Sequence, residues 1–229
     1  MDSYYGDSNM VNDLKMMQII SSRIIHDLSN PLGALGNGFE MIESENLIRD
    51  KELSRLVSFS LESAIARIKF YKIAFTDQKL SNLSIKQVEE EFVSFLGHYS
   101  RESDLPYISW LNDNDTTLLT RFLGDNILQI YANLPLLSFE LYPKCNSLKL
   151  ILSKSESSFL LTCHSESDSY IRNNLRSDIV EIFSQKESLD YKGSNIQAYM
   201  TKRIVELTGG ELALTNIQKG ISVVASWKI

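Results

Sequence analysis

The sequence has few cysteines, no basic tract and no long apolar run, and each shortage excludes a class of protein. Cys145 and Cys163 are the two cysteines among 229 residues, too few for a disulfide framework or a zinc site, so we expect a reduced, cytoplasmic protein. The net charge is −6, and no cluster of lysine and arginine suits nucleic acid. No apolar run approaches the roughly 20 residues that span a bilayer, and the polar N-terminus is no signal peptide. Neither nucleic acid nor a membrane is expected as a partner.

The first third of the chain has the pattern of two long helices. These are expected over residues 9–45 and 50–79, and the short polar segment between them is typical of an antiparallel helical hairpin. We therefore predict a helical hairpin domain over residues 1–80 and a second domain over residues 81–229.

The second predicted domain alternates between short strands and helices. The expected strands are 83–86, 106–111, 148–152, 159–163, 211–215 and 221–227. The expected helices are 87–100, 116–142, 171–185 and 194–208, the last ended by Gly209 and Gly210. This order predicts an α+β fold in which helices cover one face of a mostly antiparallel sheet, an α/β sandwich.

Apolar residues of the first helix form one stripe when they are placed at about 100° per residue. The stripe comprises Leu14, Met17, Ile24, Ile25, Leu28, Leu32, Leu35, Phe39 and Ile42. The opposite side of the helix carries Arg23, His26, Asn30, Ala34 and Asn37. A histidine on this side is not core filler, although most exposed helical histidines are simply solvated.

The residues that follow His26 give it a chemical context. Asp27 can hydrogen-bond the imidazole, fix its tautomer and raise its nucleophilicity. Pro31 costs roughly 3 kcal/mol inside a helix, so it could instead begin a second helix capped by Ser29 or Asn30. The apolar stripe continues in phase across Pro31, which favours one bent helix.

Two sequence runs carry a family resemblance. His26-Asp27-Leu28-x-x-Pro31 resembles the H-box of sensor histidine kinases, and the longer run 25–42 is similar to that of ChpT-type histidine phosphotransferases, as is the run 66–75 at the end of the second helix. The resemblance implies a dimeric four-helix bundle with His26 as phosphoryl acceptor and a C-terminal domain like that of histidine kinases. It implies transfer from the receiver domain of a hybrid histidine kinase to a response regulator. Mg²⁺ would come from the receiver, and the chain would hold no cofactor or metal of its own.

The expected nucleotide-binding elements are degenerate. Kinases of this superfamily use an Asn-rich helix, an Asp-x-Gly-x-Gly turn and a glycine-rich lid around ATP. Here Asn133 stands in an apolar helix without a paired Asn and acid, and we expect it to be a surface or capping residue. The turn 164–169 has no glycine, and Gly193 alone remains of the lid. The sequence therefore predicts a kinase-like fold without ATP chemistry.

The predicted catalytic residues are His26 and Asp27, and the protein is interpreted as a phosphotransferase without autokinase activity. Predicted docking residues for receivers are Arg23, Asn30, Ala34, Asn37 and Arg67. Arg67 has a second interpretation, a side chain that snorkels at the edge of an apolar stripe. Two other functions stay open: an ATP-dependent histidine kinase, and a non-catalytic adaptor that docks response regulators.

Overall fold

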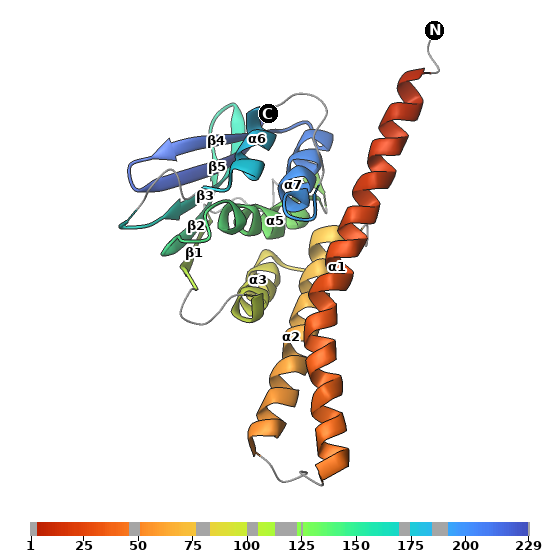
Figure 1. Ribbon diagram of the computed structural model, residues 1–229. Coiled ribbons are helices and arrows are strands. Elements are labelled where there is room, and N and C mark those ends of the chain that lie inside the picture. Colours follow the sequence, from red (N-terminus) through yellow and green to blue (C-terminus); the bar gives the residue numbers. More distant parts are fainter. Residues whose placement is uncertain are drawn as a thin grey trace.

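The structure is a computed structural model that describes residues 4–45, 51–76, 83–99, 105–112, 123–124, 126–169, 175–184 and 192–228. Two long helices, α1 (Tyr4–Glu45) and α2 (Lys51–Phe75), run side by side as a hairpin, and α1 extends well past the end of α2 (Figure 1). The predicted helical hairpin is confirmed.

Helix α1 is continuous through Pro31, so the alternative in which Pro31 starts a second helix is wrong. The hydroxyl of Ser29 donates to the Ile25 carbonyl at 2.7 Å, one turn back, and does not cap a helix. Gly38 lies buried against Val57 of α2, where the missing side chain lets the two helices approach closely.

The remaining elements form an α/β sandwich. Its helices are α3 (Ile85–Tyr99), α5 (Asn126–Leu141), α6 (Ser177–Ser184) and α7 (Ile196–Leu207). Its strands are β1 (Tyr107–Asn112), β2 (Ser147–Lys154), β3 (Ser158–Glu166), β4 (Glu211–Ile217) and β5 (Gly220–Lys228). The sheet order is β1-β2-β3-β5-β4, and every pair is antiparallel except β1 with β2. The predicted α+β class and mostly antiparallel sheet are confirmed.

One face of the sheet is covered by helices, and α5 and α7 lie between the sheet and the hairpin (Figure 1). Side chains alternate between buried and half-buried along β2 and β3, as expected for a sheet with one covered face. The core that they form also contains Phe70, Ile73 and Ala74 of α2. The end of the hairpin is therefore part of the core of the sandwich.

Some predicted elements differ from the structure. The strand expected over 83–86 is wrong, because Ser84 caps helix α3, which begins at Ile85. The Ser84 hydroxyl accepts from the Gln87 amide at 3.2 Å, and the Gln87 side chain accepts from the Ser84 amide at 2.8 Å. Helix α5 begins at Asn126, just after Gly124 at φ 59°.

The predicted helix 171–185 is shorter in the structure, since α6 begins at Ser177. Residues 50, 77–79, 100, 116–122, 125, 171–174 and 185 of the predicted helices lie outside the described residues. No helix in the part of the chain that the structure describes could cross a membrane.

Candidate functional site

His26 lies on α1 with 77% of its side chain exposed. Its Nδ1 lies 3.3 Å from Oδ1 of Asp27, the next residue along the helix. Among the described residues no group hydrogen-bonds Nε2 of this ring. The ring is therefore held at one nitrogen and accessible at the other.

Asp27 is held in turn by α2. The Tyr71 hydroxyl donates to Asp27 Oδ2 at 2.5 Å, so the two carboxylate oxygens have different partners, Tyr71 on one and His26 on the other. Burial, together with the hydrogen bond to Asp27, raises the pKa of Tyr71 above its ordinary value. The phenol thus stays protonated at neutral pH and acts as a fixed donor that orients the carboxylate.

A second set of charges connects this pair to the sandwich. The guanidinium of Arg23 lies one turn before Asp27, 3.7 Å from its Oδ2, and forms an ion pair with Glu140 at the end of α5. Burial by itself would lower the pKa of Arg23, but the Glu140 carboxylate reverses this effect and raises it. The Tyr99 hydroxyl of α3 donates to the same Glu140 oxygen at 3.4 Å.

These residues line a cleft of about 450 Å³ between α1 and the sandwich. Its walls are Ile19, Ser22, Arg23, His26, Asp27, Tyr99, Glu140, Arg176, Gly193 and Ser194. Arg176 forms a two-point ion pair with Asp178, at 3.2 and 2.7 Å, and also donates to the Ser194 carbonyl at 2.8 Å. The cleft therefore brings two arginines and the exposed histidine together.

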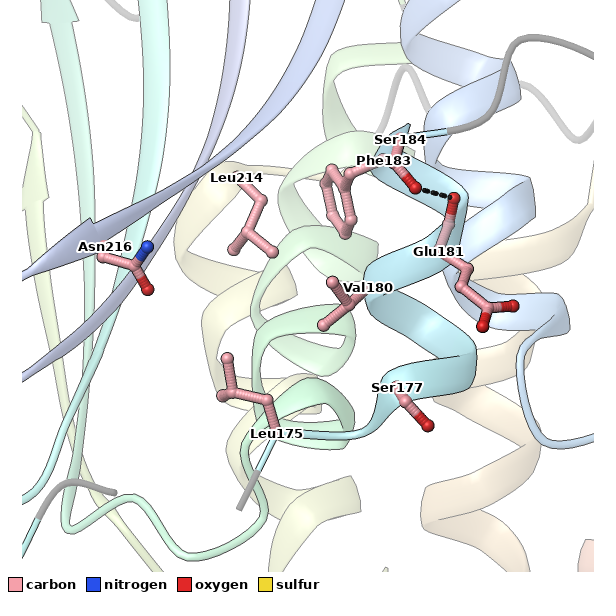
Figure 2. A pocket seen from close by; sticks show the side chains of 8 residues that line it. All are labelled: Leu175, Ser177, Val180, Glu181, Phe183, Ser184, Leu214 and Asn216. Carbon is pink, nitrogen blue, oxygen red and sulfur yellow. Dashed lines mark hydrogen bonds between the residues drawn. The ribbon is translucent and has the colours of Figure 1, made fainter. Parts of the chain in front are cut away.

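A larger cavity of about 690 Å³ lies elsewhere, between α6 and β4. Figure 2 shows Leu175, Val180, Phe183 and Leu214 around this cavity, with Glu181 pointing away from them. The hydroxyl of Ser184 donates to the Glu181 backbone carbonyl at 2.9 Å. Since its lining contains neither a histidine nor a base beside a nucleophile, we place the candidate site at His26.

The predicted docking residues differ in how far their side chains are exposed. Asn30 and Asn37 are exposed on α1 and Ala34 is half-buried, while Arg23 is mostly buried in its ion pair. Arg67 is used inside the fold: it donates to the Ser63 carbonyl at 3.2 Å and to the His98 carbonyl, at the end of α3, at 2.9 Å. Helix C-terminal carbonyls attract cations, so these contacts favour a structural role for Arg67.

The prediction for Asn133 is wrong. Its side chain is fully buried, donates to the Ala74 carbonyl of α2 at 2.9 Å and accepts from Gln197 of α7. This amide joins three helices, a role that the sequence could not reveal because its partners lie far along the chain.

Sequence reasoning also missed Tyr71, Tyr99 and Glu140. Tyr71 stands in the run 66–75 that carried the resemblance and suits core packing, but nothing in that run indicated its hydrogen bond to Asp27. Glu140 is the one charged residue of helix α5, in which nearly every side chain is buried, and a charge in such a position is a recognisable sign of a buried partner.

The structure thus combines a helical hairpin that carries an exposed histidine with an α/β sandwich packed beside it. The chain is 27% identical over 143 residues to the protein phosphotransferase ChpT of Brucella abortus (strain 2308). The aligned region covers 62% of this chain and 63% of that protein. The chain thus matches less than two thirds of the length of this relative. The resemblance to ChpT-type phosphotransferases is confirmed.

Solved structures show the same fold. A bacterial phosphotransferase, solved at 1.7 Å, superposes with a TM-score of 0.70 at 20% identity and covers 93% of this chain and 96% of that one. Histidine kinase ThkA, solved in complex with response regulator protein TrrA, gives a TM-score of 0.51 at 14% identity and covers 98% of this chain and 65% of that one. No protein-family model matches the chain.

Proposed function

We propose that the protein is a histidine phosphotransferase of a two-component phosphorelay. It accepts a phosphoryl group on His26 from the aspartyl phosphate of a receiver domain and passes it to a response regulator without ATP. The observation that carries the proposal is an exposed imidazole whose Nδ1 faces a carboxylate and whose Nε2 is open to solvent.

Asp27 prepares the nucleophile. When its Oδ1 accepts the Nδ1 proton, the lone pair of the imidazole is on Nε2, the exposed nitrogen. Tyr71 keeps the carboxylate in place from the other side. The ring therefore meets an incoming receiver in the reactive tautomer, which lowers the entropic cost of reaching the transition state.

The transfer replaces one bond to phosphorus by another. Nε2 attacks in line, the Nε2–P bond forms, and the P–O bond to the receiver aspartate breaks to leave a carboxylate. The Nδ1 proton stays on the ring, now an imidazolium that the Asp27 carboxylate stabilises. Mg²⁺ held by the receiver would neutralise the phosphoryl oxygens. The reverse reaction on a second receiver releases the phosphoryl group.

Independence from ATP has support of its own. Asn133 is occupied by Ala74 and Gln197, so its amide is not free for a nucleotide or its metal. Residues 164–169 form the end of β3 and the short segment after it and contain no glycine, so the Asp-x-Gly-x-Gly turn of the kinases has no counterpart there. Both observations favour the relay over the ATP-dependent kinase.

Two hairpins are proposed to pair as a homodimer. Large apolar side chains of α1 lie exposed along one line, namely Leu14, Met17, Ile25, Leu32 and Phe39. Helix α2 adds Leu61, Ile65 and Ile68. Water-exposed apolar stripes of this length are typical of helices that pack in a four-helix bundle. A second copy supplies matching stripes.

The test is a transfer assay with a purified, phosphorylated receiver and the full-length chain. Wild-type protein is expected to gain acid-labile phosphate, and His26→Gln to gain none. Because His26 is largely exposed, His26→Gln should change the free energy of unfolding by no more than about 0.5 kcal/mol. His98→Gln is the matched control and should keep full acceptance.

A second arm of this assay replaces the receiver by Mg-ATP and should give no phosphohistidine. Labelling from ATP would restore the kinase, and failure of the wild-type protein to accept phosphate from any receiver would favour the adaptor.

A further inference from the structure

Glu140 belongs to the sandwich and yet lies at the phosphotransfer site. It is on the last turn of α5, its side chain is 5% exposed, and its Oε1 accepts from both Arg23 and Tyr99. A buried carboxylate is costly unless it is paired, so this position fixes a cation beside it. That cation is Arg23 of α1.

Arg23 stands between two carboxylates. Its Nη2 pairs with Glu140, while its Nε lies 3.7 Å from Oδ2 of Asp27, outside hydrogen-bond range. Asp27 Oδ2 accepts instead from Tyr71, and Oδ1 faces His26. The guanidinium therefore hydrogen-bonds the acid of the sandwich and makes only the longer, 3.7 Å ion-pair contact with the acid next to the histidine.

We propose that Glu140 is a positioning residue for His26: by holding Arg23 against α5, it leaves Asp27 to accept the Nδ1 proton and so keeps Nε2 as the nucleophile. The inference rests on the proposed function, and it gives the sandwich a part in the chemistry without any nucleotide.

The charges around the site explain how the effect arises. Asp27 faces Arg23 on its own helix and Tyr71 on α2, and the same cleft contains Tyr99, Glu140 and Arg176 from the sandwich. Arg176 is already paired with Asp178. Without the Glu140 carboxylate, the acid nearest to Arg23 is Asp27. A planar guanidinium binds carboxylates at two points, so it would draw Asp27 from the imidazole.

The first experiment measures the tautomer of His26 by ¹⁵N NMR of the full-length chain. In wild-type protein we expect the Nδ1–H form to predominate, and in Glu140→Gln we expect its share to fall in favour of Nε2–H. In Arg23→Met/Glu140→Leu, which has no guanidinium to compete for Asp27, the Nδ1–H form should return. Glu91→Gln, which breaks the 3.2 Å ion pair with Lys69, is the control and should leave the tautomer unchanged.

The second experiment measures transfer from a phosphorylated receiver. Glu140→Gln should lower the rate at saturating receiver by about tenfold, equivalent to about 1.4 kcal/mol, and leave the half-saturating receiver concentration unchanged. A loss of docking would raise the half-saturating concentration instead, and that result would overturn the proposal.

The two readouts separate this inference from the proposed function. The tautomer needs no phosphoryl transfer, so a wild-type protein that accepts no phosphate contradicts the proposed function by itself. An unchanged tautomer in folded Glu140→Gln overturns the role of Glu140 even if the wild-type protein transfers phosphate. If Glu140→Gln does not fold, the double variant decides: loss of the Nδ1–H form there would show that Glu140 does not act through Arg23.

Discussion

Ala34 lies two turns beyond His26 on α1, half-buried between the exposed amides of Asn30 and Asn37. A receiver that brings its aspartate to His26 must pass over this part of the helix. We predict that Ala34→Arg slows transfer from donor and to acceptor by at least about tenfold, or about 1.4 kcal/mol. Stopped-flow or rapid-quench kinetics with purified receivers provide the measurement.

Ala34→Ser is the matched control for this prediction, because it adds a small polar group without bulk or charge. Its rates should equal those of the wild-type protein. Wild-type rates in Ala34→Arg itself would mean that receivers dock on another surface.

The buried phenol of Tyr99 leads to a prediction about how stability depends on pH. Burial and the nearby Glu140 carboxylate raise the pKa of Tyr99 from an ordinary value of 10.0 to about 12. As the pH rises, the phenol loses its proton in the unfolded chain at a lower pH than in the folded protein. Its contribution to stability is therefore present below pH 10 and is lost as the pH rises to about 12. Urea unfolding between about pH 8 and about pH 11 should show this loss.

Burial also raises the pKa of Tyr71, Cys145 and Cys163, so the whole protein loses stability in alkali for several reasons. The contribution of Tyr99 is the difference between wild-type protein and Tyr99→Phe, in which the alkaline slope should be smaller. Equal slopes would contradict the prediction.

At the residue scale, local neighbours could be predicted and distant ones could not. His26 and Asp27 are adjacent in sequence, so their pairing could be predicted from the first helix alone. Tyr71 lies 44 positions from Asp27, and Glu140 lies 117 positions from Arg23. Those contacts depend on how α2 and α5 pack against α1, which no pattern within a single helix specifies.

Among the elements, the hairpin contains a close helix contact at Gly38. A methyl group there would lie 2.6 Å from Cγ2 of Val57, nearer than packed carbon atoms tolerate. Alanine normally stabilises an exposed helix interior by up to about 1 kcal/mol relative to glycine. We predict that Gly38→Ala instead lowers the free energy of unfolding, by about 1–3 kcal/mol in chemical denaturation.

Gly33→Ala is the control on the same helix, since nothing lies within 4 Å of the added methyl group. It should raise stability slightly. Val57→Ala in the Gly38→Ala background should recover part of the loss by making room. A stabilising Gly38→Ala would show that the helices adjust their spacing freely.

Element prediction succeeded where the periodicity was long and failed where it was short. The stripe of α1 is sustained across Pro31, and the helix was correctly expected to continue. Residues 83–86 have an alternating pattern that suits a strand, but Ser84 and Gln87 form a capping box, and this local signal decides the structure. The helix predicted over residues 116–142 also ran through Gly124, but a left-handed φ of 59° at this glycine ends any continuous helix there, and α5 begins at Asn126.

The exposed apolar stripes make a prediction for the whole molecule. Phe39 is 53% exposed in one chain, and its burial against a second copy would contribute up to about 1.5–3 kcal/mol. We predict that the wild-type protein is a dimer at micromolar concentration and that Phe39→Glu shifts it to monomer, as measured by light scattering.

Asn37→Glu places the same charge on α1 at an exposed polar position, away from the stripe, and should remain dimeric. A monomeric wild-type protein at these concentrations would exclude the proposed four-helix bundle.

The end of α2 has a consequence for how the gene could change. Phe70 stacks on Phe95 of α3 with ring centroids 4.2 Å apart, and the carbonyls of Ala74 and Thr76 accept from Asn133 and Gln129 of α5. A recombination that exchanged this hairpin for another would remove a wall of the sandwich core together with His26. We therefore expect the hairpin and the sandwich to be exchanged only as one unit.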